Sequence, residues 1–501
     1  MAACAYTWGV PHPTGYPLYI LIGWIITHVC SWVEPARAMV LFSVYCGAIS
    51  VALMPVLMFR IGDLLDIKTG KVAWWLGGVI AAIYTLINRN LWSQSIVCEV
   101  YSFAFLLQCG IWLVLVEYLI AQKRKDTDAV EKNLKYLFLI FGLIAAHHLA
   151  GAGIILSILP VLFFAGSKSG KMSWKIFKSS WLIIPGLLLY LLLPIRSSFD
   201  PAMDWGNTEN FNNFIHHATG AQYSGRLFGV SISESISRLK MNLYFIRWLD
   251  FYKGLFAIGI IATFVRGIYG RILGVTLLVN IVSFLILAST YNVSDYYVFV
   301  YPLIIPCAIF LAAGIWTLEP PDVPLKNLIR LCAVVYIMIV ILVVPSIYNK
   351  VFFLYDDLDI SYGKVNEAKH FAVSSMKILP DDAVVILNTD GRSASMNYAT
   401  ICGITDNATG IHYPPRPDIF ILTANFLKFD WFHQNVEGKF DLESNETTVE
   451  GMTWDFIVHN IGEHPIYLDL NMRSVLENAG YDFDYEREES LYRILPKSLN
   501  R

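Results

Sequence analysis

Two short stretches of this chain place polar groups capable of acid–base chemistry beside apolar segments. His12 and Tyr16 lie in the segment GVPHPTGYP, and Glu99 and Tyr101 lie in the segment WSQSIVCEVY. A carboxylate or a neutral imidazole can take a proton from a hydroxyl group, and a phenol both donates and accepts hydrogen bonds. These residue types therefore suit the activation of a hydroxyl group.

A second group of polar residues follows further along the chain. It comprises His147, His148, Arg196 in LPIRSS, Trp205 in DWGN, and Gln222 and Tyr223 in HHATGAQY. The planar guanidinium of an arginine can bind a phosphate through two parallel N–H groups. Both groups together would suit an anionic, lipid-linked headgroup.

Each residue also has a simpler structural interpretation. Glu99 could cap a helix, the two histidines could form a satisfied polar corner, and Arg196 could anchor to lipid headgroups. Trp205 and Tyr223 could be interfacial aromatic residues. The common position of all these groups at one membrane surface favours a site, because ionisable groups at a membrane are usually functional.

The elements that must position these residues are membrane-spanning helices. The 501 residues are 56% hydrophobic and 15% charged, well below the charge of soluble proteins. Lipid offers no hydrogen bonds to the backbone, so apolar blocks of this length are helices. We predict an all-α polytopic bundle with about ten spans, at residues 38–59, 72–87, 102–120, 136–148, 151–166, 180–194, 252–265, 272–288, 297–316 and 328–347.

Basic loops set the orientation of these spans. Residues 121–135 and 168–178 each hold several lysines, which predicts that both loops are cytoplasmic. Two crossings must separate them, so we predict a helical hairpin that turns at His147–Gly151. A single long helix over 136–166 is the alternative.

The hairpin fixes the side of every other loop. Residues 60–71 and 266–271 become cytoplasmic, whereas residues 195–250 and 289–296 and the C-terminal domain become external. The three Asn-x-Ser/Thr sequons then lie outside, at Asn292, Asn407 and Asn445. The block Tyr16–Val33 either spans the membrane or lies along its outer surface as a juxtamembrane helix.

Three regions follow from this arrangement. Residues 1–37 form an external loop and juxtamembrane helix, residues 38–347 the membrane domain, and residues 348–501 a soluble domain. We predict that this last region is a small α/β domain with strands at Ala383–Leu387, Ile419–Leu422, Phe456–Val458 and Ile466–Leu468. The cysteines show no metal-binding spacing, and no basic patch suggests nucleic acid.

At these motifs the chain resembles a known family. GVPHPTGYPLY, WSQSIVCEVY, His147-His148 and the LPIRSS…DWGN…HHATGAQY run resemble the GT-C-type membrane glycosyltransferases of a former domain-of-unknown-function group. That group includes bacterial multi-pass proteins and the eukaryotic O-mannosyltransferase that modifies plexin and MET-type receptor domains. NTDG at residues 388–391 and RPDI at residues 416–419 resemble its external domain.

The resemblance implies an inverting transfer of a sugar, mannose in the eukaryotic member, from a polyprenyl-phosphate donor to a Ser/Thr hydroxyl of a protein acceptor. It implies neither a metal nor any other cofactor. It further implies that Glu99 and His12 act in catalysis and that Arg196 contacts phosphate. The implied donor- and substrate-binding residues are Arg196, His147, His148, Tyr16, Tyr101, Trp205, Gln222 and Tyr223.

One departure from the family pattern concerns the base. Family members carry a further span and an acidic Asp-Ser-Gly-Glu-like motif just upstream of the AAxxxGVPHP stretch. We expect the family's catalytic acid to lie there, so that this chain would bind donor while transferring sugar weakly or not at all. Glu99 would be its substitute base, unless Asp200 or Asp204 reaches the site from the long loop. The alternatives are a transporter or flippase of lipid-linked sugar and a non-catalytic binder, in a bacterial plasma membrane or the endoplasmic reticulum.

Overall fold

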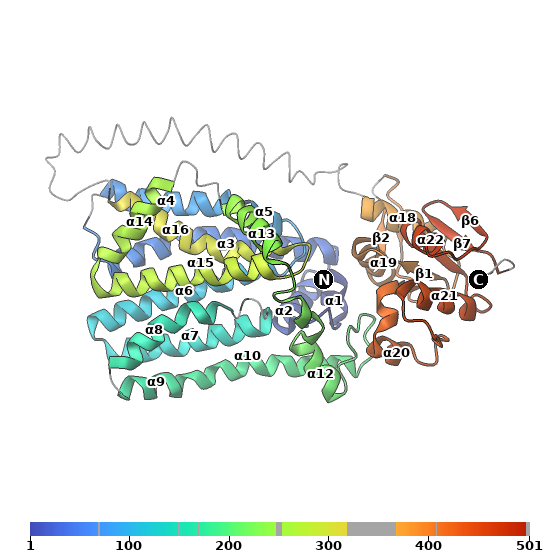
Figure 1. Cartoon of the computed structure of the whole chain (residues 1–501), viewed down its shortest axis with the longest axis horizontal. Helices are drawn as coiled ribbons and strands as arrows, with labels where there is room; N and C mark the ends of the chain where they lie inside the picture. The colour runs from blue at the N-terminus through green and yellow to red at the C-terminus, as the bar shows by residue number, and fades with distance from the viewer. Residues whose placement is uncertain are drawn as a thin grey trace.

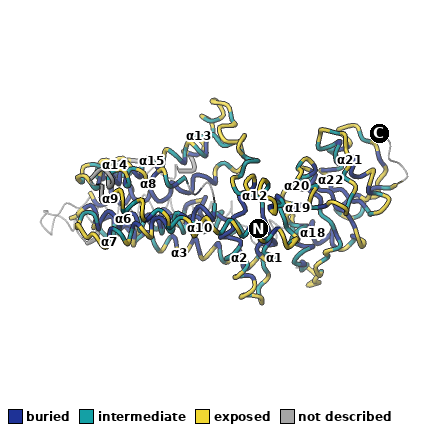
Figure 2. The backbone as a smooth tube through the Cα atoms, turned by 90° about the horizontal axis from the view of Figure 1, so that it is seen from below, coloured by how far each residue is buried: buried dark blue, intermediate teal, exposed yellow. Residues whose placement is uncertain are grey.

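The computed structural model describes residues 1–68, 71–148, 151, 153–168, 170–246, 253–317, 367–406 and 408–496. A helical bundle occupies one end of the elongated molecule and the C-terminal domain the other (Figure 1). The short helices α1 (Ala2–Thr7), α2 (Pro17–Val29) and α12 (Phe211–Ala218) lie between them, as the turned view in Figure 2 also shows. The predicted combination of a helical membrane bundle and a small α/β domain is confirmed.

The bundle consists of long helices that run roughly along the molecule's long axis (Figure 1). They are α3 (Pro35–Leu64), α4 (Lys71–Leu86), α6 (Tyr101–Arg124), α7 (Thr127–His147), α8 (Ile154–Lys168), α14 (Lys253–Val265), α15 (Gly267–Thr290) and α16 (Ile304–Trp316), which η5 (Tyr296–Leu303) precedes. A further long helical segment is the nearly continuous run of α9 (Gly170–Ser180), η2 (Trp181–Ile183), α10 (Ile184–Leu188), η3 (Leu189–Leu191) and α11 (Leu192–Ser197). Within the described ranges, five helical segments are long and apolar enough to cross a membrane. The predicted span at 328–347 and the boundary at 347/348 lie outside the described residues.

Close glycine contacts hold neighbouring helices together. A Cβ atom on Gly186 would lie 2.1 Å from the backbone carbon of Gly142, and one on Gly259 would lie within van der Waals overlap of the Phe310 carbonyl oxygen. In lipid, where helix association has no hydrophobic driving force, such small residues allow the close backbone approach that dispersion requires. The contacts fix α10 against α7 and α14 against α16.

The basic loops gather at the end of the bundle farthest from the C-terminal domain (Figure 1). Lys175 Nζ lies 3.5 Å from the Glu131 carboxylate, which joins the start of α9 to the start of α7. Lys123 pairs with Asp66 at 2.6 Å, which joins the end of α6 to the end of α3. These contacts require the chain to reverse between α7 and α8, so the predicted hairpin is present and the single long helix is wrong.

The extent of the basic loops was predicted wrongly. Residues 170–178 belong to α9, and α7 already begins at Thr127. The Asp126 carboxylate caps α7 by accepting a hydrogen bond from the Ala129 N–H, which lets the helix start within the charged stretch. Lysines and glutamates favour helices at this membrane edge, so charge alone does not mark a loop.

The opposite end of the bundle carries the shorter elements. They are α1, α2, α5 (Arg89–Ser95), α12, η4 (Ala221–Arg226) and α13 (Ile232–Ile246). Helix α2 has 13 residues, about 20 Å of helix, which is shorter than the roughly 30 Å of a bilayer core. It packs against α1, where Gly23 meets Ala5, and lies at this end of the bundle (Figure 1). This position is in keeping with the juxtamembrane alternative, which stays a prediction.

The described part of the C-terminal domain is a three-layer α/β unit. Its sheet has the order β4-β1-β5-β7-β6, with β4, β1 and β5 parallel and the β7–β6 edge antiparallel. The elements are α18 (Glu367–Ile378), β1 (Val384–Leu387), α19 (Asp390–Cys402), β2 (Ile404–Thr405), β3 (His412–Tyr413), β4 (Phe420–Thr423), η6 (Ala424–Lys428), α20 (Asp430–Val436), α21 (Val449–Asn460), β5 (Ile466–Asp469), α22 (Leu470–Asn478), β6 (Tyr485–Glu488) and β7 (Leu491–Ile494). All four β1 residues are buried, as expected of a central parallel strand.

One predicted strand of this domain is wrong. Residues Phe456–Val458 lie within helix α21, which is capped by the Thr448 hydroxyl. A short apolar run cannot distinguish a strand from a buried helix by periodicity alone. Here Trp454, Phe456 and Ile457 pack into the core of the domain from the helix.

Candidate functional site

The site begins with backbone pairing between two segments that are far apart in the sequence. The Val10 N–H donates to the Met203 carbonyl at 2.8 Å, and the Trp205 N–H donates to the Val10 carbonyl at 2.9 Å. This parallel bridge lays GVPHP alongside DWGN. It brings His12 and Trp205 together, with their rings 5.9 Å apart.

His12 is held in a defined tautomer. Its Nδ1 lies 3.0 Å from the Pro13 carbonyl oxygen, which can only accept, so Nδ1 carries the proton and Nε2 keeps a lone pair. The Tyr16 hydroxyl lies 3.2 Å from the same nitrogen and also donates to Pro13. Burial lowers the pKa of His12, while the charges of Asp390 and Asp295 raise it. The net shift keeps this half-buried imidazole neutral and able to accept a proton.

An aromatic stack continues the site towards the bundle. The rings of Tyr16 and His148 stack at 5.4 Å, and those of Tyr101 and His148 lie 5.6 Å apart. Tyr16 is buried and projects from the start of α2, Tyr101 from the start of α6, and His148 from the turn after α7. Three separate helix ends thus meet at His148.

The two adjacent histidines have different surroundings. His147 is 1% exposed, and its Nε2 donates to the Val100 carbonyl at 2.8 Å. It packs between Tyr19 and Phe103, away from the His12–Tyr16–His148 stack. The structure therefore brings His148 into the site and gives His147 the task of joining the end of α7 to the start of α6.

Glu99 lies immediately before α6, beside this stack. Burial raises the pKa of its carboxyl group, which the Val100 N–H partly offsets by hydrogen bonding. Its charge in turn acts on Tyr16, whose pKa burial raises well above the usual value. A carboxylate with a raised pKa is a stronger base, so Glu99 is suited to proton transfer.

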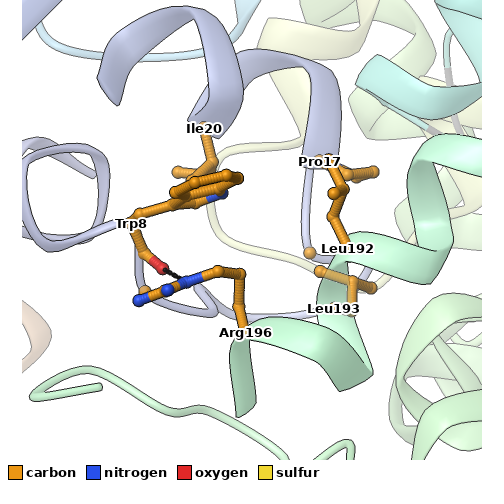
Figure 3. Close-up of a pocket in the computed structure, with 8 residues that line it drawn as sticks. Trp8, Pro17, Ile20, Leu192, Leu193 and Arg196 are labelled. Carbon is orange, nitrogen blue, oxygen red and sulfur yellow. Dashed lines mark hydrogen bonds between the residues drawn. The ribbon is translucent and has the colours of Figure 1, made fainter. Parts of the chain in front are cut away.

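Arg196 lies at the edge of a small cavity lined mostly by apolar residues (Figure 3). Its Nε donates to the Trp8 carbonyl at 2.8 Å and its Nη2 to the Thr7 carbonyl at 3.4 Å. The guanidinium also lies over the Trp8 ring, 5.0 Å from its centre. These contacts cap the C-terminal end of α1, and they occupy two of the five N–H groups that an arginine offers.

Gln222 and Tyr223 follow α12 in the helical turn η4. A side-chain hydrogen bond joins the two residues, and Arg226 lies over the Tyr223 ring at 5.3 Å. Burial raises the pKa of Tyr223, and its charge reaches Tyr16 and Tyr291. Tyr223 is thus close enough to act electrostatically on Tyr16, and Gln222 lies beside it.

Comparisons with known proteins bear on the family resemblance and on the fold. A family model described as the N-terminal domain of protein O-mannosyl-transferase TMEM260 matches residues 1–171. That segment contains GVPHPTGYP, WSQSIVCEVY and both histidines of the 147–148 pair. The resemblance to this family is confirmed.

The curated relatives are named protein O-mannosyl-transferase TMEM260. The one from Dictyostelium discoideum is 26% identical over 262 residues, which cover 48% of this chain and 30% of the relative. The one from Mus musculus is 26% identical over 238 residues, which cover 47% of this chain and 31% of the relative. The match to this chain therefore spans about a third of the length of these relatives.

Two solved structures share the fold. ArnT from Cupriavidus metallidurans in the apo state has a TM-score of 0.57 at 10% identity and covers 98% of this chain and 89% of its own. The same protein bound to undecaprenyl phosphate has a TM-score of 0.55 at 10% identity and covers 96% and 87%. The chain is an integral membrane protein with this GT-C fold.

Three residues of the site were missed in the sequence analysis. Asp295 follows the loop after α15, and Asp390 opens α19 in the C-terminal domain; the charge of each acts on His12. His217 of α12 is 2% exposed, and a ring nitrogen donates to the Pro11 carbonyl. Gly206 has a φ of 98°, and a Cβ atom there would lie 2.3 Å from His217 Nδ1, so this position must be glycine. The sequence shows the pairs HH (residues 216–217) and DG (residues 390–391). It does not show that they lie near His12 in the folded protein.

Among the residues that the structure describes, no group of three or more His, Cys, Asp or Glu side chains is arranged to hold a metal ion.

The buried carboxyl group of Asp204, in the paired segment DWGN, should make the stability of the protein depend on pH. Burial raises the pKa of its carboxyl group from 3.8 to about 6, although the Ser197 hydroxyl donates to it at 2.8 Å. Between these pH values the folded state keeps a proton that the unfolded state loses, so stability falls as the pH rises through this window. Asp204→Asn should therefore be more stable than the parent at pH 8, and the difference should shrink towards pH 4.

Thermal unfolding in detergent at several pH values measures this difference. The exposed Asp482→Asn, in the C-terminal domain, serves as the matched control and should show no such pH-dependent gap. If Asp204→Asn exceeds the parent in thermal stability by the same amount at pH 4 and pH 8, burial of the ionised carboxylate does not destabilise the protein.

Proposed function

We propose that this chain is an inverting membrane glycosyltransferase that transfers a sugar, with mannose the first candidate, from a polyprenyl-phosphate donor to a Ser/Thr hydroxyl of a protein. The observation that carries the proposal is the meeting of His12, Glu99, Tyr16, His148 and Arg196 at one end of a GT-C bundle. The names of the O-mannosyltransferase relatives support the activity, and the undecaprenyl phosphate bound to ArnT supports the donor class.

The reaction asks two things of the site. The acceptor oxygen attacks the anomeric carbon as the bond from that carbon to the phosphate oxygen breaks, and polyprenyl phosphate leaves with the bonding electron pair. The acceptor's proton passes to a base, which is worth about 10²–10⁴-fold in rate. Glu99 and the Nε2 lone pair of His12 are the bases, and the remaining N–H groups of Arg196 are available to the leaving phosphate.

The arrangement of ionisable groups favours this function over transport. Transporters place such groups near mid-membrane on interrupted helices. Here Glu117 of α6 pairs with Arg60 at the basic end of the bundle, and the site residues lie at the other end. The polar groups are therefore placed to act on a headgroup at one surface.

We further propose that the site end faces the exterior or the lumen. The gathering of lysines at the other end supports this orientation, because basic loops remain cytoplasmic. Asn445 lies exposed in the C-terminal domain and should be glycosylated when the chain is expressed in eukaryotic cells. Lys125→Asn, which creates an Asn-x-Thr sequon in the α6–α7 turn, should remain unmodified. Modification of the Lys125→Asn site but not of Asn445 would reverse the proposed orientation.

The phosphate contact predicts a graded effect at Arg196. Arg196→Ala should weaken binding of a polyprenyl-phosphate sugar by roughly 1.5–3 kcal/mol, about tenfold to a hundredfold in Kd. Arg196→Lys should restore binding only partly, because an ammonium group lacks the planar fork. Arg271→Ala, at the basic end of the bundle, is the matched control. Unchanged donor binding in Arg196→Ala would leave Arg196 with only its role at the end of α1.

The base assignment predicts a change in rate and in its pH dependence. Glu99→Gln should lower kcat at least a hundredfold and remove the acid limb of the pH profile. In the parent, activity should fall as the pH drops through the raised pKa of Glu99, above the usual 4.5, because only the carboxylate accepts a proton.

Transfer from a radiolabelled polyprenyl-phosphate mannose to a folded acceptor domain measures both effects. Glu463→Gln, exposed in the C-terminal domain, is the control. Full activity of Glu99→Gln together with an inactive His12→Asn would assign the base to His12 instead. A parent protein that binds the donor yet transfers no sugar would be a non-catalytic binder, and the proposed function would be wrong.

A further inference from the structure

Trp205 lies between His12 and the C-terminal domain. On one side its ring is 5.9 Å from that of His12. On the other it meets Phe426 edge-on at 4.5 Å and stacks with Trp431 at 6.1 Å. One indole thus connects the proposed catalytic imidazole to two aromatic residues that lie more than 200 residues after it in the sequence.

The contacts that the C-terminal domain makes around Trp205 come from one short segment, residues 424–436, which covers η6 and α20. The Asn435 Nδ2 donates to the Asp204 carbonyl at 2.7 Å. The Gln434 Oε1 accepts from Asn213 at 3.0 Å and from Asn207 at 3.3 Å. These bonds hold the backbone on both sides of Trp205.

The indole N–H groups of Trp205 and Trp431 are both buried and have no hydrogen-bond partner among the described residues. The two rings are therefore held by shape and stacking rather than by hydrogen bonds of their own. Their positions depend on each other, since removal of one ring leaves a gap beside the second.

A second, separate attachment joins the same domain to the bundle. The Tyr398 hydroxyl of α19 donates to the Glu34 carboxylate at 3.1 Å and accepts from the Ala36 N–H at 3.3 Å. This attachment reaches the start of α3 and does not involve Trp205. Attachment of the domain and packing of Trp205 can thus be separated by mutation.

We propose that residues 424–436 are a positioning element of the active site, which sets the His12 imidazole through Trp205 and the Val10–Asp204 bridge. The inference rests on the proposed function, because it assigns a catalytic consequence to this packing. The C-terminal domain is then a working part of the site, and Trp431, Gln434 and Asn435 are positioning residues. The charge of Asp390, which also comes from this domain, reaches His12 and Tyr223 and is consistent with that placement.

The test compares variants at the two attachments in the full chain. Trp431→Ala should lower kcat at least tenfold with the donor KM within about twofold, because a displacement of about 1 Å in a catalytic group can cost 10²-fold. Trp431→Phe should recover most of the rate, because a smaller ring still fills the position beside Trp205. The exposed Gln434→Ala, combined with Asn435→Ala, should act in the same direction as Trp431→Ala. Tyr398→Phe, the control, should leave kcat unchanged.

A second readout does not require turnover. The rate at which diethyl pyrocarbonate modifies His12, followed by mass spectrometry, should rise in Trp431→Ala and return towards the parent value in Trp431→Phe. It should not change in Tyr398→Phe. A thermal melt of each variant shows whether it is folded. If Trp431→Ala is unfolded, the double variant at positions 434 and 435 takes its place in the test.

Each possible outcome either supports or overturns the positioning role of residues 424–436. Loss of kcat and faster His12 modification in the 431 and 434/435 variants, but not in Tyr398→Phe, supports the positioning role. An unchanged His12 modification rate in those variants overturns it, as does an equal loss in Tyr398→Phe, which would mean that attachment alone matters. If the parent transfers no sugar, the proposed function fails, while the modification rates still decide whether residues 424–436 position His12.

Discussion

The site depends on the parallel backbone bridge between Val10 and the segment Met203–Trp205. Both segments are irregular, and each has buried N–H and carbonyl groups that need partners at the membrane edge. By pairing with each other they satisfy these groups and bring together His12 from the segment before α2 and Trp205 from the long loop after α11. His217 adds a contact to Pro11, which explains why Gly206 has no room for a side chain. Without this bridge the polar motifs would be separate loops rather than a site.

The membrane imposes the second constraint, since it divides the chain into two chemically different ends. Ion pairs such as Lys175–Glu131 and Lys123–Asp66 collect at one end, whereas neutral imidazoles, phenols and a carboxylate collect at the other. Burial keeps His12 neutral and favours the protonated form of Glu99, so both groups are poised for proton exchange rather than for salt bridges. A headgroup that enters from the lipid would meet these groups at the membrane surface, which is the geometry that a lipid-linked donor requires.

Much of the bundle followed from the sequence because lipid leaves the backbone few choices. The basic loops alone required the hairpin after His147, and the contact between Lys175 and Glu131 bears it out. Predictions failed where a local pattern has two solutions: Phe456–Val458 fits a strand or a buried helix, and the lysines of α9 fit a loop or a helix end. The different surroundings of His147 and His148 depend on the exact end of α7. The approach of Asp390 to His12 depends on domain docking, for which no local pattern exists.

This chain shares its fold with ArnT and matches the family model over residues 1–171. We propose that its headgroup site lies at the His12 end of the bundle. The most direct measurement is an experimental structure with a non-reactive polyprenyl-phosphate-mannose analogue bound. The account predicts the phosphate beside Arg196 and the sugar among His12, Tyr16 and His148, with the anomeric carbon within reach of Glu99 or His12. A headgroup bound near mid-membrane between the helices, or at the lysine-rich end, would contradict it.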